Sequence, residues 1–419
     1  MIVLSGGEIV LPDRTLSPGT LVIDGDRIAE IRPGAAPGAI EGSQAASTLS
    51  FHGRYIIPGF IDVHVHGVDG VDSLDDGEAI SAIASSLPRY GVTAFCPTTV
   101  ACGPAALRRV LQQVRQARHS PAALAARVLA AHLESNFINP EFRGAQPAGC
   151  LRSPLAALQG KSRADLPGPP VSAGLKGPPY VREFTAADLL REIERAAADV
   201  GIVTLAPELD GGIDLVRWLV ARSHRVSLGH SGATYDQALE AIAAGARHAT
   251  HLFNRMPPLG HRSPGLVGAI LQAKEVAAEL ICDGFHVHPT LVRTAIAAKG
   301  PSRIMAITDG TAASGLPAGA RATLGGEPIT AGESAAFLED GTIAGSILTM
   351  DGAFRMLVRK VGLSLVDAVT VCSTTPASEL GLAGHGVIAA GAAADLVVLD
   401  AQLSVLQTYV GGKLAFTRN

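Results

Sequence analysis

PGFIDVHVHG, residues 58–67, is an apolar run with two histidines near its end, His64 and His66. We predict that this run is a buried strand, on which side chains two residues apart share a face. Two imidazoles that point the same way from the end of a strand can hold one divalent metal ion. The His-x-His pattern is short, so a pair of hydrogen-bonded core histidines remains the alternative reading of this segment alone.

Further apolar runs follow, with amphipathic helical stretches between them. Together with the first run they give eight strand candidates, at residues 56–66, 93–100, 128–134, 202–208, 225–231, 248–254, 278–283 and 303–309. This alternation is typical of parallel βαβ units, and eight such strands close a barrel. The sequence therefore predicts the α/β class with a (β/α)8 TIM-type barrel. Thr185 and Thr234 are placed to cap two of the helices.

Nearly every strand candidate ends in a side chain suited to chemistry. These are His64, His66, Thr98, Thr99, Glu134, Glu208, His230, His251, Asn254, Asp283 and Asp309. In a barrel the carboxyl ends of the strands meet on one rim, where barrel active sites lie. Polar ends that are merely solvated would explain one or two of these positions, but not most of eight.

The two chain ends have a different pattern, in which short β-branched runs alternate with turn signals. We predict that residues 1–53 and 385–419 pair into one small β-sandwich domain and that residues 54–384 form the barrel. Residues 146–182 are rich in proline and glycine and are predicted to be an insertion, either a lid, a surface facing a partner or a disordered linker. Residues 311–345 are predicted to form a hairpin excursion.

The composition excludes several classes of partner. The 419 residues are 47% hydrophobic and carry a formal net charge of −4, from 34 basic and 38 acidic side chains. No basic run suits a nucleic acid or an acidic membrane, and no apolar run is long enough to span a bilayer. Five widely spaced cysteines and the lack of a signal peptide favour a soluble, cytoplasmic protein.

Taken together, the polar strand ends predict a metal centre. Imidazole with carboxylate suits Zn²⁺ or Fe²⁺, and the set is large enough for one or two ions. With Glu134 bridging, His64 and His66 would serve one ion, and His230 and His251 the other. Asp309 is our choice for the carboxylate that moves a proton during hydrolysis of an amide. Its alternative role is that of a turn residue before Gly310.

A second group of side chains predicts substrate recognition. Asn254, Arg255, Arg262 and His286 offer an amide, guanidinium groups and an imidazole, and Arg262 with His286 could hold an anion such as phosphate. No glycine-rich phosphate loop accompanies them. For the two arginines, ordinary surface solvation is the alternative.

Several blocks of the sequence resemble the N-acetylglucosamine-6-phosphate deacetylase family of the amidohydrolase superfamily. They are PGFIDVHVHG (58–67), AHLESNFINPEFRGAQ (131–146), LAPE (205–208), SLGHSGATYDQA (227–238), ATHLFNRMPPLGHRSPG (249–265), LICDGFHVHP (280–289), AITDG (306–310) and AGSILTMDGA (344–353). The resemblance implies a metal-dependent barrel with a β-sandwich, a homodimer, and deacetylation of N-acetylglucosamine 6-phosphate to glucosamine 6-phosphate and acetate.

By matching positions, the resemblance also implies roles for individual residues. Glu134, His230 and His251 would be the primary metal ligands, with Asp309 as the catalytic acid and base. The histidine pair His64 and His66 is similar to that of the two-metal members. The implied substrate contacts are Asn254, Arg255, Arg262, His286, Ile343, Ala344, Gly345 and Ser346, with Arg262 and His286 reaching the phosphate across the dimer.

Three departures from the family pattern lie beside Glu134. Ser135-Asn136 replaces Gly-Pro, Gln146 replaces a histidine that contacts the sugar, and the family lacks most of residues 146–182. Gln146 is therefore also predicted to contact the substrate. These departures leave open a related N-acetylated amino sugar, with or without a phosphate. Hydrolysis of an N-acyl amino acid or a cyclic amide is a further alternative, although no lysine stands where the cyclic-amide enzymes carry their bridge. The remaining alternative is a non-catalytic barrel, which would be expected to lack some of the metal ligands.

Overall fold

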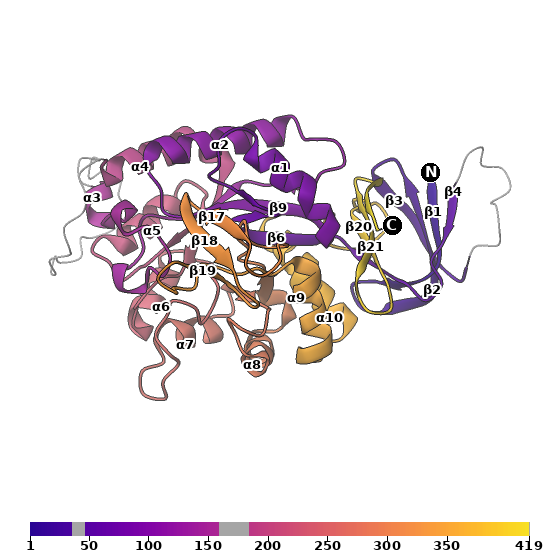
Figure 1. The fold of residues 1–419 in the computed structure, drawn as a ribbon. Coiled ribbons are helices and arrows are strands. Elements are labelled where there is room, and N and C mark those ends of the chain that lie inside the picture. The colour runs from indigo at the N-terminus through magenta and orange to yellow at the C-terminus, as the bar shows by residue number, and fades with distance from the viewer. Residues whose placement is uncertain (36–46, 159–183, 419) are drawn as a thin grey trace.

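The structure, a computed structural model, describes residues 1–35, 47–158 and 184–418. Figure 1 shows a large part in which helices surround a group of strands, and a smaller all-β part that holds both chain ends. Among the described residues, no helix has both the length and the apolar character needed to cross a bilayer.

The two chain ends form one eight-stranded sheet. β5 (Tyr55–Pro58) pairs with β1 (Ile2–Val10) on one side and with β20 (Leu396–Leu399) on the other, which joins the N-terminal and C-terminal segments. The remaining strands are β2 (Thr15–Asp24), β3 (Arg27–Pro33), β4 (Ser47–Ser50), β21 (Val405–Val410) and β22 (Lys413–Thr417). Their inner faces enclose a separate apolar core that contains Leu4, Ile56 and Tyr409. The β-sandwich predicted from the two ends is confirmed.

The larger part is a parallel barrel. Its strands, in spatial order, are β6 (Phe60–Val65), β9 (Val92–Thr99), β11 (Ala131–Glu134), β12 (Val200–Leu205), β13 (Arg225–Leu228), β14 (His248–Ala249), β15 (Ala277–Ile281) and β16 (Ile304–Ile307). The short strand β10 (Arg127–Val128) also pairs with β9. A parallel bridge between Val65 and Gly310 links the last strand back to the first. The (β/α)8 barrel predicted from eight apolar runs is confirmed.

Helices cover the outside of the barrel (Figure 1). They are α1 (Ala79–Ser86), α2 (Pro104–His119), α3 (Pro154–Leu158), α4 (Ala186–Arg195), α5 (Gly212–Val220), α6 (Tyr235–Ala243), α7 (Gly265–Gln272), α8 (Pro289–Lys299), α9 (Met350–Met356), α10 (Leu365–Val369) and α11 (Thr375–Glu379). Thr185 and Thr234 cap α4 and α6 with complete capping boxes, as predicted.

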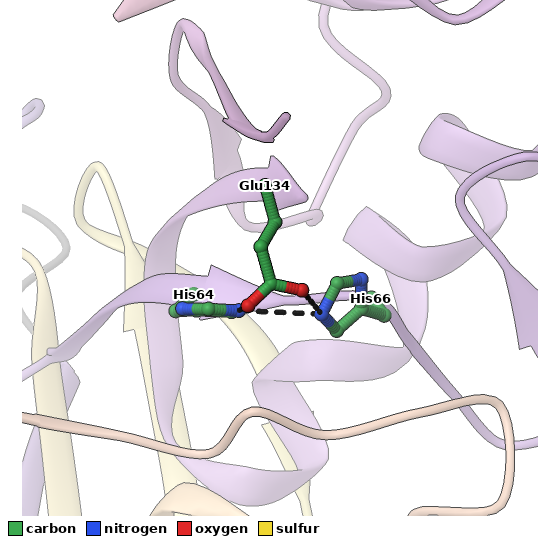
Figure 2. Close-up of side chains that lie close together, drawn as sticks. All are labelled: His64, His66 and Glu134. Atoms are coloured by element: carbon green, nitrogen blue, oxygen red, sulfur yellow. Dashed lines mark hydrogen bonds and ion pairs between the residues drawn. The ribbon is translucent and has the colours of Figure 1, made fainter. Parts of the chain in front are cut away.

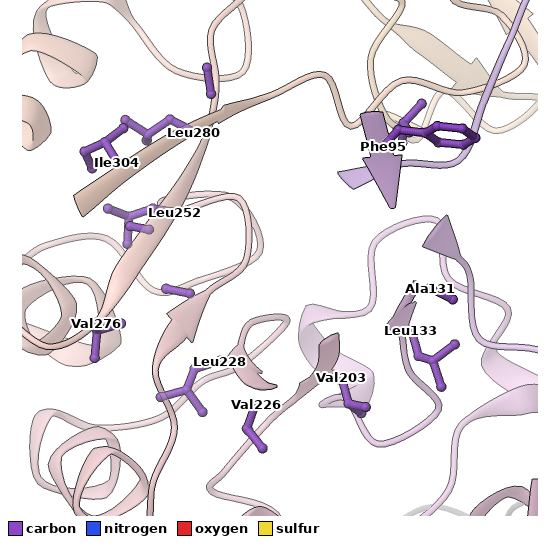
Figure 3. Packing of buried hydrophobic residues seen from close by; sticks show 14 of the residues in the cluster. Phe95, Ala131, Leu133, Val203, Val226, Leu228, Leu252, Val276, Leu280 and Ile304 are labelled. Carbon is purple, nitrogen blue, oxygen red and sulfur yellow. The ribbon is translucent and has the colours of Figure 1, made fainter. Parts of the chain in front are cut away.

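One face of each barrel strand packs against the helices, and the other lines the barrel interior. Figure 3 shows side chains of the outer layer, among them Phe95, Leu133, Val203, Leu228 and Leu280. A second cluster fills the interior and includes Ile61, Ile202 and Met305. Because side chains alternate along a strand, the residues between the outer-layer positions of each strand point into the barrel. Polar residues at those positions are therefore buried beneath the rim.

The single strand predicted over residues 56–66 is wrong, because the chain forms β5 and then β6 in two different sheets. Gly59 separates them, and a β-carbon there would lie 2.2 Å from side-chain atoms of Thr93. The amide of Gly59 donates to the carbonyl oxygen of Asp395, 2.9 Å away. The division into domains at residues 53/54 and 384/385 stays a prediction, and the pairing of β5 suggests a first boundary nearer Gly59.

Two irregular segments were predicted between the strands. The hairpin excursion over residues 311–345 is present as the antiparallel strands β17 (Arg321–Leu324), β18 (Glu327–Ala331) and β19 (Ala336–Leu338). The insertion predicted over residues 146–182 lies mostly outside the described residues, which omit 159–183. Its described beginning contains a 3-10 turn at Ala148–Cys150 and the short helix α3.

Candidate active site

His64, His66 and Glu134 meet at the rim of the barrel although they come from different strands. Figure 2 shows the two imidazoles below the Glu134 carboxylate. The Nε2 atoms of His64 and His66 are 3.2 Å apart, and the carboxylate oxygens lie 3.8 Å from His64 and 3.5 Å from His66. His64 lies on β6 and His66 directly after it, and their two side chains face each other as the prediction of a shared face requires.

His230 and His251 lie on the other side of the same carboxylate. Their Nε2 atoms are 2.8 and 2.9 Å from Glu134 Oε1 and 3.0 Å from each other. Asp309 completes the group, because its Oδ1 atom is 3.2 Å from His64 Nε2 and 3.3 Å from His66 Nε2. The donor atoms thus meet in one place although they come from distant parts of the chain: the end of β6, β11, and the segments that follow β13, β14 and β16.

The backbone is strained where these side chains are presented. His230, His251 and Asp309 have φ values of 48°, 29° and 48°, in the left-handed region that non-glycine residues rarely adopt. Phe253 and Arg255, which follow His251, have φ values of 79° and 53°. Such conformations cost about 1–3 kcal/mol each and persist where the surrounding structure requires them. The short turns after β13, β14 and β16 aim these residues at the centre.

The electrostatics of the centre favour a positive ion. Burial raises the pKa of Glu134, but the His230 imidazole, together with His251 and His66, outweighs this and holds that pKa well below its ordinary value. Burial lowers the pKa of His66, but hydrogen bonds with Asp309 and Glu134 outweigh this and raise it to about 9. The low pKa of Glu134 means that this carboxylate keeps its negative charge, and the raised pKa of His66 means that its surroundings stabilise a positive charge. Both effects describe a site that suits a cation.

The donor set fits a divalent metal. Among the described residues, three groups of three donor atoms lie within 4.8 Å of one another. Two of them share Glu134, one with His64 and His66 and the other with His230 and His251, and the third lies beneath the rim and consists of His64, His132 and Glu279. In each of the two groups that share Glu134, two Nε2 atoms face each other at 3.0–3.2 Å, and their lone pairs repel unless a proton or a cation lies between them. Nitrogen and carboxylate donors of this kind match Zn²⁺ and Fe²⁺.

A cavity of about 510 Å³ opens over the centre, and His66, Glu134, His230, His251 and Asp309 form part of its wall. The excursion after β16 contributes Leu324, Ile343 and Gly345 to the wall of the same cavity. A pocket of this size takes a ligand of a few hundred daltons and presents it to the donor atoms.

Three comparisons with known proteins agree with this geometry. Residues 55–415 match the model of the Amidohydrolase family. The N-acetylglucosamine-6-phosphate deacetylase of Bacillus subtilis (strain 168) is 33% identical over 365 residues, which cover 86% of this chain and 84% of that protein.

The chain belongs to the N-acetylglucosamine-6-phosphate deacetylase family of the amidohydrolases. Another relative, the N-acetylgalactosamine-6-phosphate deacetylase of Escherichia coli O157:H7, is 34% identical, and the match covers 86% of this chain and 87% of that protein. The N-acetyl-D-glucosamine-6-phosphate deacetylase of Mycobacterium smegmatis was solved as a variant in complex with N-acetyl-D-glucosamine-6-phosphate. That structure superposes with a TM-score of 0.83 at 32% identity and covers 99% of both chains.

In this amidohydrolase most of the predicted substrate residues lie at the cavity. Gln146, Asn254, Arg255, His286, Ile343 and Gly345 contribute to its wall. His286 is the most informative of them, because Asp283 Oδ2 lies 2.6 Å from its Nδ1 atom while its buried Nε2 atom has no hydrogen-bond partner among the described residues. That nitrogen is available to a ligand.

Three predicted substrate residues do not line the cavity. Ala344 and Ser346 are fully buried, and the Ser346 hydroxyl donates to the carbonyl oxygen of Thr308. Arg262 is exposed on the loop before α7. Gln146 lines the cavity, but both ends of its amide are already used, since its oxygen accepts from the Ala101 amide at 2.7 Å and its nitrogen donates to Glu134.

The residues that depart from the family pattern have structural partners. The Ser135 hydroxyl donates to the carbonyl oxygen of Thr204, and the Asn136 side chain donates to the carbonyl oxygens of Cys102 and Cys150, 2.8 and 2.7 Å away. They fix the chain after β11 to its neighbours without entering the cavity.

Sequence reasoning missed buried polar residues beneath the rim. Glu279 on β15 and His132 on β11 are both fully buried, and Glu279 Oε2 lies 2.9 Å from His64 Nδ1. Burial lowers the pKa of His132 to about 4, so this imidazole is neutral. Burial also raises the pKa of Asp62 to about 7, although Thr308 donates a hydrogen bond to it. The available signal was a charged or imidazole side chain inside an otherwise apolar strand, since such residues are rarely buried without a reason.

Proposed function

We propose that this protein is a metal-dependent hydrolase that deacetylates N-acetylglucosamine 6-phosphate to glucosamine 6-phosphate and acetate. The observation that carries the proposal is the convergence of Glu134, His230 and His251 within 3.0 Å of one another at the wall of the cavity, with Asp309 beside them. Two relatives named for this activity match 86% and 99% of this chain.

A divalent cation held by these donors would polarise the acetamide carbonyl and lower the pKa of a water molecule to about 7. Asp309 would take the proton of that water as oxygen attacks the carbonyl carbon, and it would deliver the proton to the amine nitrogen as the C–N bond breaks. The products are acetate and the free amine. Asp309 Oδ1 lies 3.2 and 3.3 Å from the Nε2 atoms of His64 and His66, so this carboxylate stands beside the donors that would hold the ion.

We propose Zn²⁺ or Fe²⁺ as the ion, with two ions per chain sharing Glu134. The two groups of donors that share Glu134 support this number. We also propose that the protein is a cytoplasmic homodimer in which the exposed Arg262 of one subunit approaches the phosphate held by the other. The exposed position of Arg262 in this single chain is consistent with such a role.

Within one subunit, His286 is the strongest candidate for the phosphate contact. Its free Nε2 atom lies at the wall of the cavity, and Asp283 holds the ring through Nδ1. An imidazole N–H can donate a hydrogen bond to a phosphate oxygen. Arg255, exposed at the cavity mouth, adds a positive charge.

N-acetylgalactosamine 6-phosphate is a second candidate substrate. The Escherichia coli relative named for that sugar is 34% identical to this chain, against 33% for the Bacillus subtilis relative named for N-acetylglucosamine 6-phosphate. In addition, Gln146 occupies the position of the family histidine that contacts the sugar, and its amide is engaged by Ala101 and Glu134. The two sugars differ only in the configuration at C4, so the wall around that hydroxyl would decide between them.

The test is acetate release by the metal-loaded protein from both phosphorylated sugars and from their unphosphorylated forms. We expect kcat/KM to be highest for N-acetylglucosamine 6-phosphate and to fall at least tenfold without the phosphate. Glu134→Gln should abolish release, whereas the control Glu192→Gln should not, because Glu192 is a buried carboxylate paired with Arg108 on the outer helices. Release that is no faster in the wild type than in Glu134→Gln would disprove the proposal.

A further inference from the structure

Glu279 lies in the middle of β15, in the barrel interior, and its side chain is completely buried. Its neighbours at alternate positions, Ala277 and Ile281, belong to the interior apolar cluster, while Ala278 and Leu280 pack against the helices. The carboxylate therefore points inward, beneath the rim. A buried carboxylate loses its hydration, and this loss must be offset by partners inside the barrel.

The side chain of Glu279 lies against the neutral His132, whose Nδ1 atom is 3.8 Å from Oε1, and against two of the metal-binding candidates. Its Oε2 atom accepts a hydrogen bond from His64 Nδ1 at 2.9 Å and lies 3.4 Å from the backbone nitrogen of His251. Its backbone carbonyl accepts from the amide of Leu252 at 2.9 Å. Glu279 thus contacts one ligand candidate from each of the two donor groups that share Glu134. It contacts the side chain of His64 and the backbone of His251.

The hydrogen bond to Glu279 fixes which nitrogen of His64 faces the centre. With the proton on Nδ1, the lone pair of Nε2 points toward His66, Glu134 and Asp309, which lie 3.2–3.8 Å away. A histidine that ligates a metal commonly donates its other N–H to a carboxylate or a carbonyl, which holds the ring and makes it more basic.

The two halves of the centre differ in this support. His230 donates its Nδ1–H to the neutral carbonyl oxygen of Phe142 at 2.8 Å, whereas His64 donates to a charged carboxylate. The Nδ1 atoms of His66 and His251 have no hydrogen-bond partner among the described residues. In the pair formed by His64 and His66, Glu279 is therefore the only side chain among the described residues that holds an imidazole through its Nδ1 atom.

The charge of Glu279 also matters for the occupancy of the centre. Two divalent cations bring four positive charges into a buried site, and Glu134 and Asp309 offset two of them. Glu279 adds a third negative charge directly behind His64. Because buried charges are costly unless they are compensated, this third carboxylate favours the binding of a second ion.

We propose that Glu279 is a positioning residue that orients His64 and enables the half-site of His64 and His66 to hold its own metal ion. This inference rests on the proposed function, since it requires that the centre binds metal. It goes further in assigning the two-ion state to a buried carboxylate that contacts neither the ions nor the substrate. A purely structural role, in which Glu279 only joins β15 to β6, is the competing explanation.

The test compares Glu279→Gln with the wild type and with Glu192→Gln, using the full chain. The proteins are stripped with a chelator and titrated with Zn²⁺ in competition with a chromophoric chelator, and bound zinc is counted by atomic emission. Glutamine keeps the shape of glutamate but offers only a neutral acceptor, so this variant weakens the hydrogen bond that holds His64 and removes the charge behind it. We expect one of two ions to bind about 10–100-fold more weakly in Glu279→Gln and the other to bind as in the wild type.

A second comparison separates positioning from stability. In a His64→Asn background, Glu279→Gln should cause no further loss of zinc, because its effect passes through His64. Unchanged affinity of every bound ion in the folded Glu279→Gln protein would overturn the inference, as would equal weakening of all ions. If Glu279→Gln does not fold, Glu279→Asp replaces it, and wild-type binding there would also overturn the inference. Absence of zinc from the wild type would instead defeat the proposed function.

Discussion

Asp309 lies between the metal-binding candidates and the cavity that would hold the substrate. It follows the last barrel strand, its φ of 48° directs the carboxylate at the histidine pair, and it lines the cavity. Burial raises the pKa of Asp309, but the His64 and His66 imidazoles outweigh this and hold the pKa well below its ordinary value. A carboxylate that starts ionised is ready to accept a proton from water.

Replacing Asp309 by asparagine should separate proton transfer from the rest of the site. Asn has the same shape but cannot accept and return a proton, so we expect kcat to fall by about 10²–10⁴-fold while zinc is still bound through the remaining donors. Steady-state acetate release and metal analysis on the same preparation measure the two effects. A kcat within twofold of the wild type would contradict the role assigned to Asp309.

At the scale of single residues, the sequence predicts side chains at strand ends better than those inside strands. His64, His66, Glu134, His230, His251 and Asp309 could be selected because each stands where an apolar run stops. Glu279 was not selected because the same rule pointed to Asp283, at the end of that run. Ser346 and Ala344 were selected by resemblance, and their burial shows that proximity in sequence to a wall residue does not place a side chain in the cavity.

The helices connect the barrel strands and so set where each strand end emerges. α6 begins five residues after His230. Thr234 caps it by accepting from the Gln237 amide, while the Gln237 side chain accepts from the Thr234 amide at 2.9 Å. This reciprocal pair satisfies two amides that the first turn of a helix leaves unpaired.

Thr234→Ala should destabilise the protein by about 0.5–2 kcal/mol, the usual cost of a lost N-cap. Thermal or urea unfolding at fixed metal concentration measures this change. Thr294→Ala is the matched control, because Thr294 is exposed on α8 and its hydroxyl only donates back to the Thr290 carbonyl. Equal stability of the Thr234→Ala and Thr294→Ala proteins would show that the cap contributes nothing.

At the scale of elements, the existence of each strand could be predicted but its boundaries could not. The run 56–66 is continuously apolar, so hydrophobicity gives no sign that the chain changes sheets at Gly59. The run 128–134 also divides, into β10 and β11, although both of these strands pair with β9 in one sheet. Each break depends on contacts with distant segments, such as Thr93 against Gly59, that local sequence does not contain.

The sandwich and the barrel are joined by a polar link at Asp395, just before β20. Its carboxylate accepts from Arg127 at 3.1 and 3.2 Å, from the Gly411 amide at 2.7 Å, and pairs with His385 Nδ1 at 2.9 Å. Arg127 belongs to β10 on the barrel, so this one side chain connects the two parts. The pairing of the chain ends could be predicted from their similar patterns, whereas a contact between residues 127 and 395 leaves no local trace.

Asp395→Asn should lower stability near neutral pH by about 1.5–3 kcal/mol, the range for hydrogen bonds to charged groups. Burial raises the pKa of Asp395, but hydrogen bonds from His385 and Arg127 outweigh this and hold it below its ordinary value. The stabilisation is therefore complete above the ordinary pKa of about 3.8 and is lost as the pH falls through the lower folded-state pKa.

Thermal unfolding across a pH series should show this dependence. The difference between wild type and Asp395→Asn is expected to be largest at neutral pH and to shrink in acid. Asp13→Asn, at an exposed ion pair with Arg14, should show little difference at any pH. A difference between wild type and Asp395→Asn that does not change down to strongly acidic pH would contradict the assigned ionisation.

The most direct measurement is anomalous X-ray diffraction at the zinc and iron absorption edges, from crystals of the protein purified without chelators. The central claim is that residues from distant parts of the chain bind one cation. An anomalous peak should therefore lie about 2.0–2.2 Å from the Nε2 atoms of His230 and His251 and from an oxygen of Glu134. A second peak beside His64 and His66 is expected for the two-ion state. Diffraction from an active preparation with no anomalous peak among these residues would contradict the account.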